Sequence, residues 1–358
     1  MSQDIEKLLN KRASEINSTI EKYIPRKLEK NSIVFALSPP HYAYDLEALN
    51  KAIAEPIWEF LDRGGKRWRP ALFLLVCEAL GKNSKDFLDF AIIPEVIHNG
   101  TLMVDDLEDS SELRRGKPCT YRIFGIDIAV NAGNAMYFLP LLSAIKNKAK
   151  FEQDKINRLY EIFIEEMVNI SLGQAMDITW HRGMANADKI TEEHYLQMCA
   201  YKTGTLARMA ARMAAVLAGA DKNIVEKLGR FAESIGVAFQ MQDDILDLSG
   251  GEFAEKKGAR GMDITEGKRT LMVIHTLGNA EPKDKKRLIG ILNEHANNQK
   301  LRDEAIRIIE NYDSIEYTKQ FARKLVKESW NEIDRLLPAS DAKEELRAFA
   351  AYLIERKI

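Results

Sequence analysis

The sequence predicts an all-α protein, and three observations support this fold class. Apolar residues recur at helical spacing along most of the 358 residues, as in helices that pack one face on a core. Alternating apolar and polar runs, which are typical of half-buried strands, are hard to find. No stretch rich in proline, glycine and serine divides the chain, so we predict one domain. Within it, helices at 1–55 and 281–358 are expected to flank a core at 56–280.

Five segments carry the helical pattern most clearly. The first runs from Ile92 to Leu107 and contains Pro94, which either kinks the helix or lies near its first turn. The other segments are Ile156 to Asp177, Tyr195 to Leu217, Val225 to Asp247 and Ser314 to Leu337. Loops are expected near Ser38–Tyr44, Gly250–Gly261 and Asn279–Lys285.

Composition excludes several classes of protein. The chain has 52 Lys and Arg against 54 Asp and Glu, so it lacks the basic excess of a nucleic-acid binder. A hydrophobic content of 46% argues against intrinsic disorder. The three cysteines form no CxxC pair, which favours a reducing compartment. Because no signal peptide or long apolar run is present, we expect a soluble, cytoplasmic protein without a transmembrane segment.

Two aspartate triplets of the form DDxxD stand out, DDLED at Asp105–Asp109 and DDILD at Asp243–Asp247. Two chance matches are expected in only about 0.3% of such chains. Residues i and i+4 share a helix face, so the outer carboxylates of each motif lie together and repel unless a cation separates them. Magnesium suits such oxygen ligands and completes its coordination with substrate phosphates. The alternative, solvated acidic helix ends, is less favourable because acids destabilise helix C-termini.

Basic residues beside glycine or beside the aspartates indicate a local phosphate site. The segment LDRGGKRWRP carries Lys66 and Arg69, and Arg114 and Arg115 follow the first triplet. Glycine lets the backbone approach an anion, and arginine binds phosphate oxygens in pairs. His98 and Gln240 precede the two triplets on roughly the same helix faces. For any one of these basic residues alone, a solvated surface charge is the alternative.

These motifs together resemble those of the trans-isoprenyl diphosphate synthases. GGKRWRP, IHNGTLMVDDLEDSSELRRG, YKTG, FQMQDDILD and DITEGKRTL occur in the family's order between Leu61 and Leu277. The first aspartate region, followed by NAGNAMYF, is most similar to the geranylgeranyl diphosphate synthases. The resemblance implies a helical bundle around a deep cavity, with the two aspartate motifs facing each other across its mouth. It also implies a homodimer that condenses isopentenyl diphosphate head-to-tail with an allylic diphosphate.

The resemblance also implies roles for individual residues. Magnesium (Mg2+) would be bound by Asp105 and Asp109 on one side and by Asp243 on the other, while the remaining aspartates, Asp106, Asp244 and Asp247, would hold metal-bound waters or orient the ligands. The allylic diphosphate would be held by Arg114, Lys202, Thr203, Gln240 and Lys268. Isopentenyl diphosphate would be held by Lys66, Arg69, His98 and Arg115. The family's usual lysine after the second triplet falls near Gly258 here, so Lys257 is its nearest substitute.

Product length is expected to depend on the residues one turn before Asp105. Bulky aromatics there would stop growth at fifteen carbons, but this chain has Gly100 and Thr101. Gly100 could equally serve helix packing alone. In geranylgeranyl-type enzymes the residues that close the end of the product channel, its floor, are an aromatic pair, matched here by Tyr137 and Phe138. A third floor position, an imidazole in some relatives, falls at Ser171. We therefore expect a twenty-carbon product, with twenty-five carbons or more as the alternative and farnesyl diphosphate disfavoured.

Two other classes of protein share part of this pattern. Metal-dependent terpene cyclases also use DDxxD, but their second metal motif normally mixes Asn, Ser and Glu, and they do not need GGKRWRP. A non-catalytic partner subunit typically loses an aspartate motif or the basic residues, and neither is lost here.

Overall fold

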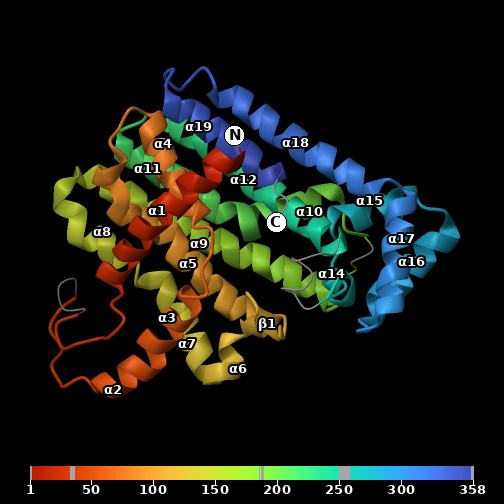
Figure 1. The fold of residues 1–358 in the computed structure, drawn as a ribbon, viewed down its shortest axis with the longest axis horizontal. Coiled ribbons are helices and arrows are strands. Elements are labelled where there is room, and N and C mark those ends of the chain that lie inside the picture. Colours follow the sequence, from red (N-terminus) through yellow and green to blue (C-terminus); the bar gives the residue numbers. More distant parts are fainter. Residues whose placement is uncertain (1, 33–36, 185, 187–188, 250–258, 356–358) are drawn as a thin grey trace. The chain divides into compact units, whose positions relative to one another are not determined.

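The computed structural model describes residues 2–32, 37–184, 186, 189–249 and 259–355 (Figure 1). Over these residues the fold is helical apart from one two-stranded hairpin, so the predicted all-α class is confirmed. The chain divides into two compact units, which are described separately. Unit 1 comprises Met1–Phe163, Met209–Leu228 and Leu336–Ala348; unit 2 comprises Ile164–Arg208, Gly229–Arg335 and Phe349–Ile358. The single-domain organisation stays a prediction.

Most of unit 1 is a succession of helices from the first 163 residues. The α-helices are α1 (Ser2–Tyr23), α2 (Leu46–Leu49), α3 (Glu55–Leu61), α4 (Trp68–Ala79), α5 (Leu88–Glu108), α6 (Thr120–Phe124), α7 (Ile126–Phe138) and α8 (Leu141–Asn147). Shorter 3-10 or π-helical pieces are η1 (Asn50–Ala54), η2 (Ser84–Phe87) and η3 (Lys148–Lys150). Strands β1 (Leu113–Arg114) and β2 (Lys117–Pro118) pair antiparallel.

Helix α5 is the centre of unit 1. It packs most extensively on α7, and its residues Ile92, Val96 and Met103 join apolar side chains from α1, α3 and α7 in one buried cluster. Pro94 is the seventh residue of α5, so it lies in the helix interior rather than in the first turn. The buried cluster holds α5 in place, and the first aspartate motif lies at the C-terminal end of this helix.

Unit 2 contains α10 (Glu192–Cys199), η5 (Ala200–Gly204), α14 (Met262–Thr265), α15 (Leu271–Asn279), α16 (Pro282–Glu294), α17 (Gln299–Asn311) and α18 (Ser314–Ile333). Four helices contribute residues to both units, α9 (Gln153–His181), α11 (Thr205–Ala218), α12 (Lys222–Ser249) and α19 (Asp341–Glu355). A second buried cluster joins the end of α12 to helices α14 to α17 through Ile245, Leu248 and Ile264. This core supports the second aspartate motif.

The predicted helical segments are largely confirmed, with two differences, and one predicted loop differs in extent. Tyr195 to Leu217 is not one regular helix, because the π-helical turn η5 interrupts it. Helix α18 ends at Ile333 rather than Leu337. The expected loop at Asn279–Lys285 is wrong in extent, since α15 reaches Asn279 and α16 starts at Pro282 with a proline in its first turn. The expected loop at 250–261 falls mostly on residues 250–258, outside the described residues.

Two helical stretches, Ser84–Glu108 and Ile126–Lys150, are long and apolar enough to cross a membrane. The most apolar window of the first stretch is 67% buried inside the structure, and that of the second stretch is 44% buried. The first contains α5, the central helix of the unit 1 core, and buried core helices meet the same criteria of length and composition. The two stretches are therefore weak evidence for a membrane span, and a chain without one remains our expectation.

Candidate active site

The first aspartate motif lies at the C-terminal end of α5. Asp109 caps the helix, and its backbone N–H donates to the carbonyl oxygen of Asp105 at 2.9 Å. Asp105 and Asp109 are partly exposed, one turn apart, whereas Asp106 is fully buried. Arg114 Nε donates to Asp106 Oδ1 at 2.6 Å, and Arg114 Nη2 lies 3.6 Å from Asp105 Oδ2. The structure thus leaves the two outer carboxylates partly accessible and uses the inner one to hold an arginine.

Asp106 is held in an unusual electrostatic environment. Burial raises the pKa of its carboxyl group, while Arg114 acts in the opposite direction. The Cys119 side chain also interacts with this carboxyl group, although the buried Oδ2 atom itself has no hydrogen-bond partner by geometry among the described residues. A buried carboxylate oxygen of this kind is stabilised by a cation or a donor such as water. The arrangement therefore fits a role for Asp106 in orienting ligands around the motif.

A tight hairpin presents the two arginines that follow the motif. Leu113 pairs with Pro118 and Arg114 with Lys117, which leaves Arg115 and Gly116 as the two turn residues. Both have positive φ, 53° and 76°, as a type I′ turn requires. Arginine rarely adopts this conformation, and such backbone strain tends to occur at functional positions. Sequence reasoning missed this hairpin because its strands have only two residues each.

Four arginines surround His98 on α5. Burial, together with the charges of Arg69, Arg115, Arg114 and Arg67, lowers the pKa of His98 well below its ordinary value, so the imidazole is neutral. Burial, reinforced by Arg67 and Arg114, also lowers the pKa of Arg115 to about 10, although Glu95 opposes this shift. A cluster of cations that repel one another in a partly buried place is suited to binding a multiply charged anion.

A polar network holds two of these arginines, Arg67 and Arg115. Arg67 Nη1 contacts Glu95 Oε1 at 3.0 Å, and Asn99 Nδ2 donates to the same carboxylate oxygen at 3.1 Å. Asn99 Oδ1 in turn accepts from Arg115 Nη2 at 3.3 Å, and Arg115 Nη1 donates to the Gly64 carbonyl. Of the residues predicted for isopentenyl diphosphate, Arg69 and Arg115 lie close enough to His98 for their charges to lower its pKa. Lys66 is exposed in the loop before α4.

Four of the five residues predicted to set product length lie on α5 and α7, which pack on each other. A β-carbon built on Gly100 would lie 2.7 Å from the Gly133 carbonyl oxygen, 2.8 Å from Met136 Cβ and 3.2 Å from Tyr137 Cε1. Gly100 therefore serves helix packing, the alternative left open by the sequence. Thr101 is partly exposed, and its hydroxyl donates to the His98 carbonyl at 2.8 Å. The floor role of both small residues stays a prediction.

Tyr137 and Phe138 differ in their surroundings. Burial raises the pKa of the Tyr137 phenol, and the charges of Glu108 and Asp105 act in the same direction, so its ring lies near the first aspartate motif. Phe138 is 62% exposed. Of the expected aromatic pair, only Tyr137 is partly buried, and the role of both rings in setting product length stays a prediction. Ser171, in unit 2, is exposed, and its hydroxyl donates to the Met167 carbonyl of its own helix.

The second aspartate motif lies near the end of α12. Asp243 is partly exposed, whereas Asp244 and Asp247 are buried and held by protein donors. Asp244 accepts from the Tyr195 hydroxyl at 2.7 Å and from Gln240 Nε2 at 2.8 Å. Asp247 accepts from the backbone N–H of Asp263 at 3.1 Å. As in the first motif, the structure separates an accessible carboxylate from buried, oriented ones.

The YKTG motif forms the π-helical turn η5, between α10 and α11. Lys202 Nζ lies 2.5 Å from Asp177 Oδ2 on α9. The Thr203 hydroxyl donates to Gln240 Oε1 at 2.9 Å on α12. Short π-helical turns occur often at functional sites. The structure therefore brings together three residues predicted for the allylic diphosphate, namely Lys202, Thr203 and Gln240.

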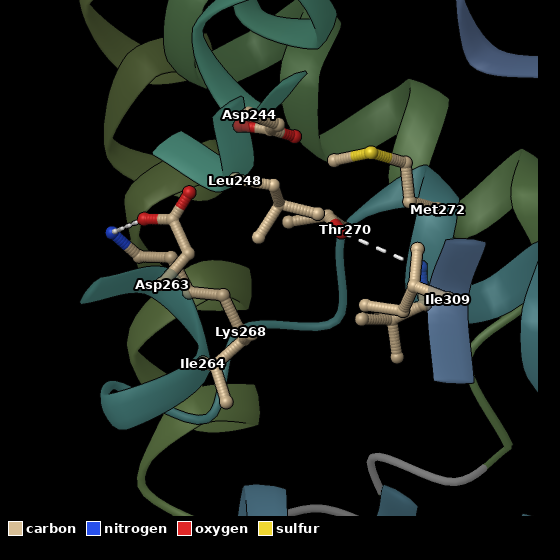
Figure 2. A pocket seen from close by; sticks show the side chains of 9 residues that line it. Asp244, Leu248, Asp263, Ile264, Lys268, Thr270, Met272 and Ile309 are labelled. Atoms are coloured by element: carbon tan, nitrogen blue, oxygen red, sulfur yellow. Dashed lines mark hydrogen bonds and ion pairs between the residues drawn. The ribbon is translucent and has the colours of Figure 1, made fainter. Parts of the chain in front are cut away.

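A small pocket in unit 2 connects the second motif to Lys268 (Figure 2). Asp244, Leu248, Asp263, Thr270 and Met272 are among its lining residues. Figure 2 shows the side chains of Asp263 and Lys268 directed toward each other, with the Lys268 amine 3.7 Å from Asp263 Oδ1 and 2.6 Å from Glu266 Oε2. Lys257 lies outside the described residues.

The donor chemistry fits magnesium rather than a closed protein cage. Among the described residues, no three His, Cys, Asp or Glu side chains gather closely enough to enclose a metal ion. Magnesium usually takes only one or two carboxylates from the protein and completes its octahedron with water and substrate phosphates. Asp105, Asp109 and Asp243 are the partly exposed carboxylates that match this pattern.

Sequence reasoning missed three residues that orient the predicted ones. Tyr195 holds Asp244, Asp177 holds Lys202, and Asn99 joins Arg115 to Glu95. Asn99 follows the predicted His98 on α5, and Asp177 lies six residues after the predicted Ser171 on α9. Their closeness in sequence to predicted residues could have indicated them. Tyr195 is 49 residues from its partner, so no local pattern could reveal it.

Comparison with known proteins gives consistent matches. Residues 50–309 match the polyprenyl synthetase family model. The chain is 34% identical over 294 residues to a short chain isoprenyl diphosphate synthase of Methanothermobacter thermautotrophicus, covering 82% of this chain and 87% of that protein. It is 33% identical over 299 residues to a geranylgeranyl diphosphate synthase of Methanosarcina mazei, covering 83% and 87%. A crystal structure of geranylgeranyl pyrophosphate synthetase from Pyrococcus horikoshii is similar with a TM-score of 0.83 at 29% identity, covering 99% of this chain and 100% of that one.

Proposed function

The chain belongs to the polyprenyl synthetase family, and from this we propose that it is a trans-prenyltransferase that condenses isopentenyl diphosphate with an allylic diphosphate to make geranylgeranyl diphosphate. The proposal rests on a combination of residues that both units contain. Each unit has an aspartate motif near a helix end, with at least one outer carboxylate that is partly exposed. Each unit also has basic residues. A diphosphate requires this combination of cations and metal-binding carboxylates.

We assign the contacts with the two substrates to two sets of residues. Arg114, Lys202, Thr203, Gln240 and Lys268 would bind the allylic diphosphate, and Lys66, Arg69, His98 and Arg115 would bind isopentenyl diphosphate. These donors stabilise the negative charge that develops as the allylic carbon–oxygen bond breaks. The double bond of isopentenyl diphosphate then forms the new carbon–carbon bond, and a proton is lost to the departed diphosphate. No protein nucleophile is required.

Magnesium would be held by Asp105 and Asp109 in unit 1 and by Asp243 in unit 2. When bound, it supplies Lewis-acid stabilisation of the leaving diphosphate. Asp106 in unit 1, and Asp244 and Asp247 in unit 2, would each orient the carboxylates of their own motif, which fits their burial and their protein donors. The role of Lys257 as a substitute for the family's lysine belongs to the same proposal.

We also infer a cytoplasmic homodimer. The three cysteines are free and buried, as expected in a reducing compartment. Ile164, Val168 and Leu172 on α9 are 60%, 53% and 51% exposed, and their i, i+4, i+8 spacing puts them on one helix face. An exposed apolar stripe of this kind is typical of a surface covered by a partner. Light scattering coupled to size exclusion tests for a dimer.

Product analysis tests the main proposal. The purified protein is incubated with isopentenyl diphosphate, farnesyl diphosphate and magnesium, and the products are dephosphorylated and chromatographed. A dominant twenty-carbon alcohol supports geranylgeranyl synthesis. A ladder of longer alcohols keeps the chemistry but favours the longer-chain alternative, which the exposure of Phe138 and the small Ser171 would explain. Absence of product with every allylic primer contradicts the proposal and favours a partner subunit.

A further inference from the structure

The π-helical turn Ala200–Gly204 is held between helices α9 and α12 within unit 2. A β-carbon on Gly173 of α9 would lie 2.7 Å from the Tyr201 carbonyl carbon and would also collide with the Lys202 amide nitrogen. A β-carbon on Gly236 of α12 would lie 2.6 Å from Gly204 Cα and 3.2 Å from the Thr203 carbonyl oxygen. Both flanking helices can approach the turn this closely only because they carry glycine there.

An ion triad joins the same three segments one turn beyond the π-helical turn. Arg208 Nε donates to Glu166 Oε1 on α9 at 2.8 Å, and Arg208 Nη2 donates to Glu166 Oε2 at 2.6 Å. Arg208 Nη1 contacts Glu233 on α12. The Glu166 side chain is fully buried, and that of Arg208 is nearly so. A forked arginine bound to two carboxylates has little freedom to rotate.

The contacts form matching layers along the two flanking helices. Three residues of α9 contact this region. Glu166 binds Arg208, and Gly173 lies against the Lys202 backbone. Asp177 binds the Lys202 amine. Their spacing of seven and four residues puts them on one face. Three residues of α12 do the same from the other side. Glu233 binds Arg208, and Gly236 lies against the backbone at Thr203 and Gly204. Gln240 accepts from the Thr203 hydroxyl. Their spacing of three and four residues also gives one face.

From these layers we propose that Arg208, with Glu166, Glu233, Gly173 and Gly236, is a positioning device that sets where the π-helical turn presents Lys202 and Thr203 to the allylic diphosphate. A π-helical turn is less favourable than an α-helical one and persists when its surroundings determine it. Because a small displacement of a binding group weakens a charged contact strongly, the device acts on affinity for one of the two substrates. This inference rests on the proposed function of Lys202 and Thr203.

Two variants and two matched controls test the device. Glu233→Gln removes the negative charge from one arm of the triad, at a side chain that is 29% exposed, and Gly173→Ala adds a methyl group that would collide with the backbone of the turn. The control Glu226→Gln removes an ion-paired glutamate earlier on α12, which contacts Arg158 and Arg212 instead. The control Gly290→Ala adds a methyl group to helix α16, where nothing lies within 4 Å.

We expect Glu233→Gln and Gly173→Ala to raise the KM for the allylic diphosphate about tenfold, with the KM for isopentenyl diphosphate changed less than about twofold. The controls should leave both constants within about twofold. A fall in melting temperature with an unchanged allylic KM would mean a merely structural role and would overturn the inference. If Gly173→Ala does not fold, Glu233→Gln decides alone.

Failure of the proposed function has a different signature. In that case the wild-type protein forms no prenyl product at all. Calorimetric titration with inorganic diphosphate and magnesium then tests the device directly, because Lys202 and Thr203 still present the same donors. Weaker binding in the two variants than in the two controls supports the positioning role, and equal binding in all four contradicts it.

Discussion

Gly100 and Gly133 face each other where α5 packs on α7. A β-carbon on Gly100 would lie 2.7 Å from the Gly133 carbonyl oxygen, and one on Gly133 would lie 3.2 Å from the Gly100 carbonyl oxygen. The two helices therefore approach closely just before the first aspartate motif. This contact lies five residues before Asp105 on the same helix.

Gly100→Ala is expected to destabilise the protein by about 1–3 kcal/mol, because the added methyl group meets backbone and Met136 Cβ that cannot easily move. Chemical denaturation measures the change. Gly278→Ala in helix α15 is the control, since nothing lies within 4 Å of that position, and it should not destabilise. Equal stability of the two variants would contradict the close helix contact.

Tyr137→Ala is expected to lengthen the product. The Tyr137 ring lies beside Gly100 and near Asp105, so its removal opens space next to the first motif. Chromatography of the dephosphorylated alcohols measures the shift beyond twenty carbons. Phe138→Ala is the comparison, because Phe138 is exposed within this chain. If Tyr137→Ala leaves the profile unchanged, the floor lies elsewhere; if Phe138→Ala alone changes it, the exposed ring contributes through another molecule.

Asp105→Ala and Asp243→Ala should each reduce kcat by roughly a thousandfold or more, because each removes a carboxylate proposed to hold magnesium, a loss of several kcal/mol of stabilisation. Diphosphate release measures turnover, and circular dichroism should show an intact fold. Asp154→Ala, an exposed aspartate in the first turn of α9, should keep normal activity. Normal turnover in either motif variant would overturn the metal assignment.

Stability should depend on pH through His98. Its folded-state pKa lies well below the ordinary value of 6.5, so the unfolded chain binds the proton more readily between these values. Stability from this group is therefore fully present above about pH 6.5 and is lost as the pH falls below it. We expect the melting temperature of His98→Asn to fall less on acidification than that of the wild type. The exposed His41→Asn variant should behave like the wild type, and identical pH profiles for all three would contradict this account.

Sequence periodicity predicts α5, α9 and α12 well, because each is long and presents one apolar face to a core. Spacing also singles out the two DDxxD motifs at Asp105–Asp109 and Asp243–Asp247, because helical spacing is a local property, while the metal-binding role of their carboxylates stays a prediction. The π-helical turn at Lys202 was not predictable in this way, since it depends on Gly173 and Gly236 far away in the sequence. The same holds for the Tyr195 contact with Asp244. The hairpin at Leu113–Pro118 is too short to show an alternating pattern.

The π-helical turn has a consequence for insertions and deletions. An α-helix advances about 100° per residue, so the additional residue in a π-helical turn sets the rotation of everything that follows it. Deleting one residue within Ala200–Gly204 would turn Arg208 by about that angle away from Glu166. Substitutions that preserve the residue count keep the angular phase of α11. In this part of the chain, a change in length therefore displaces Arg208 even when every remaining side chain is kept.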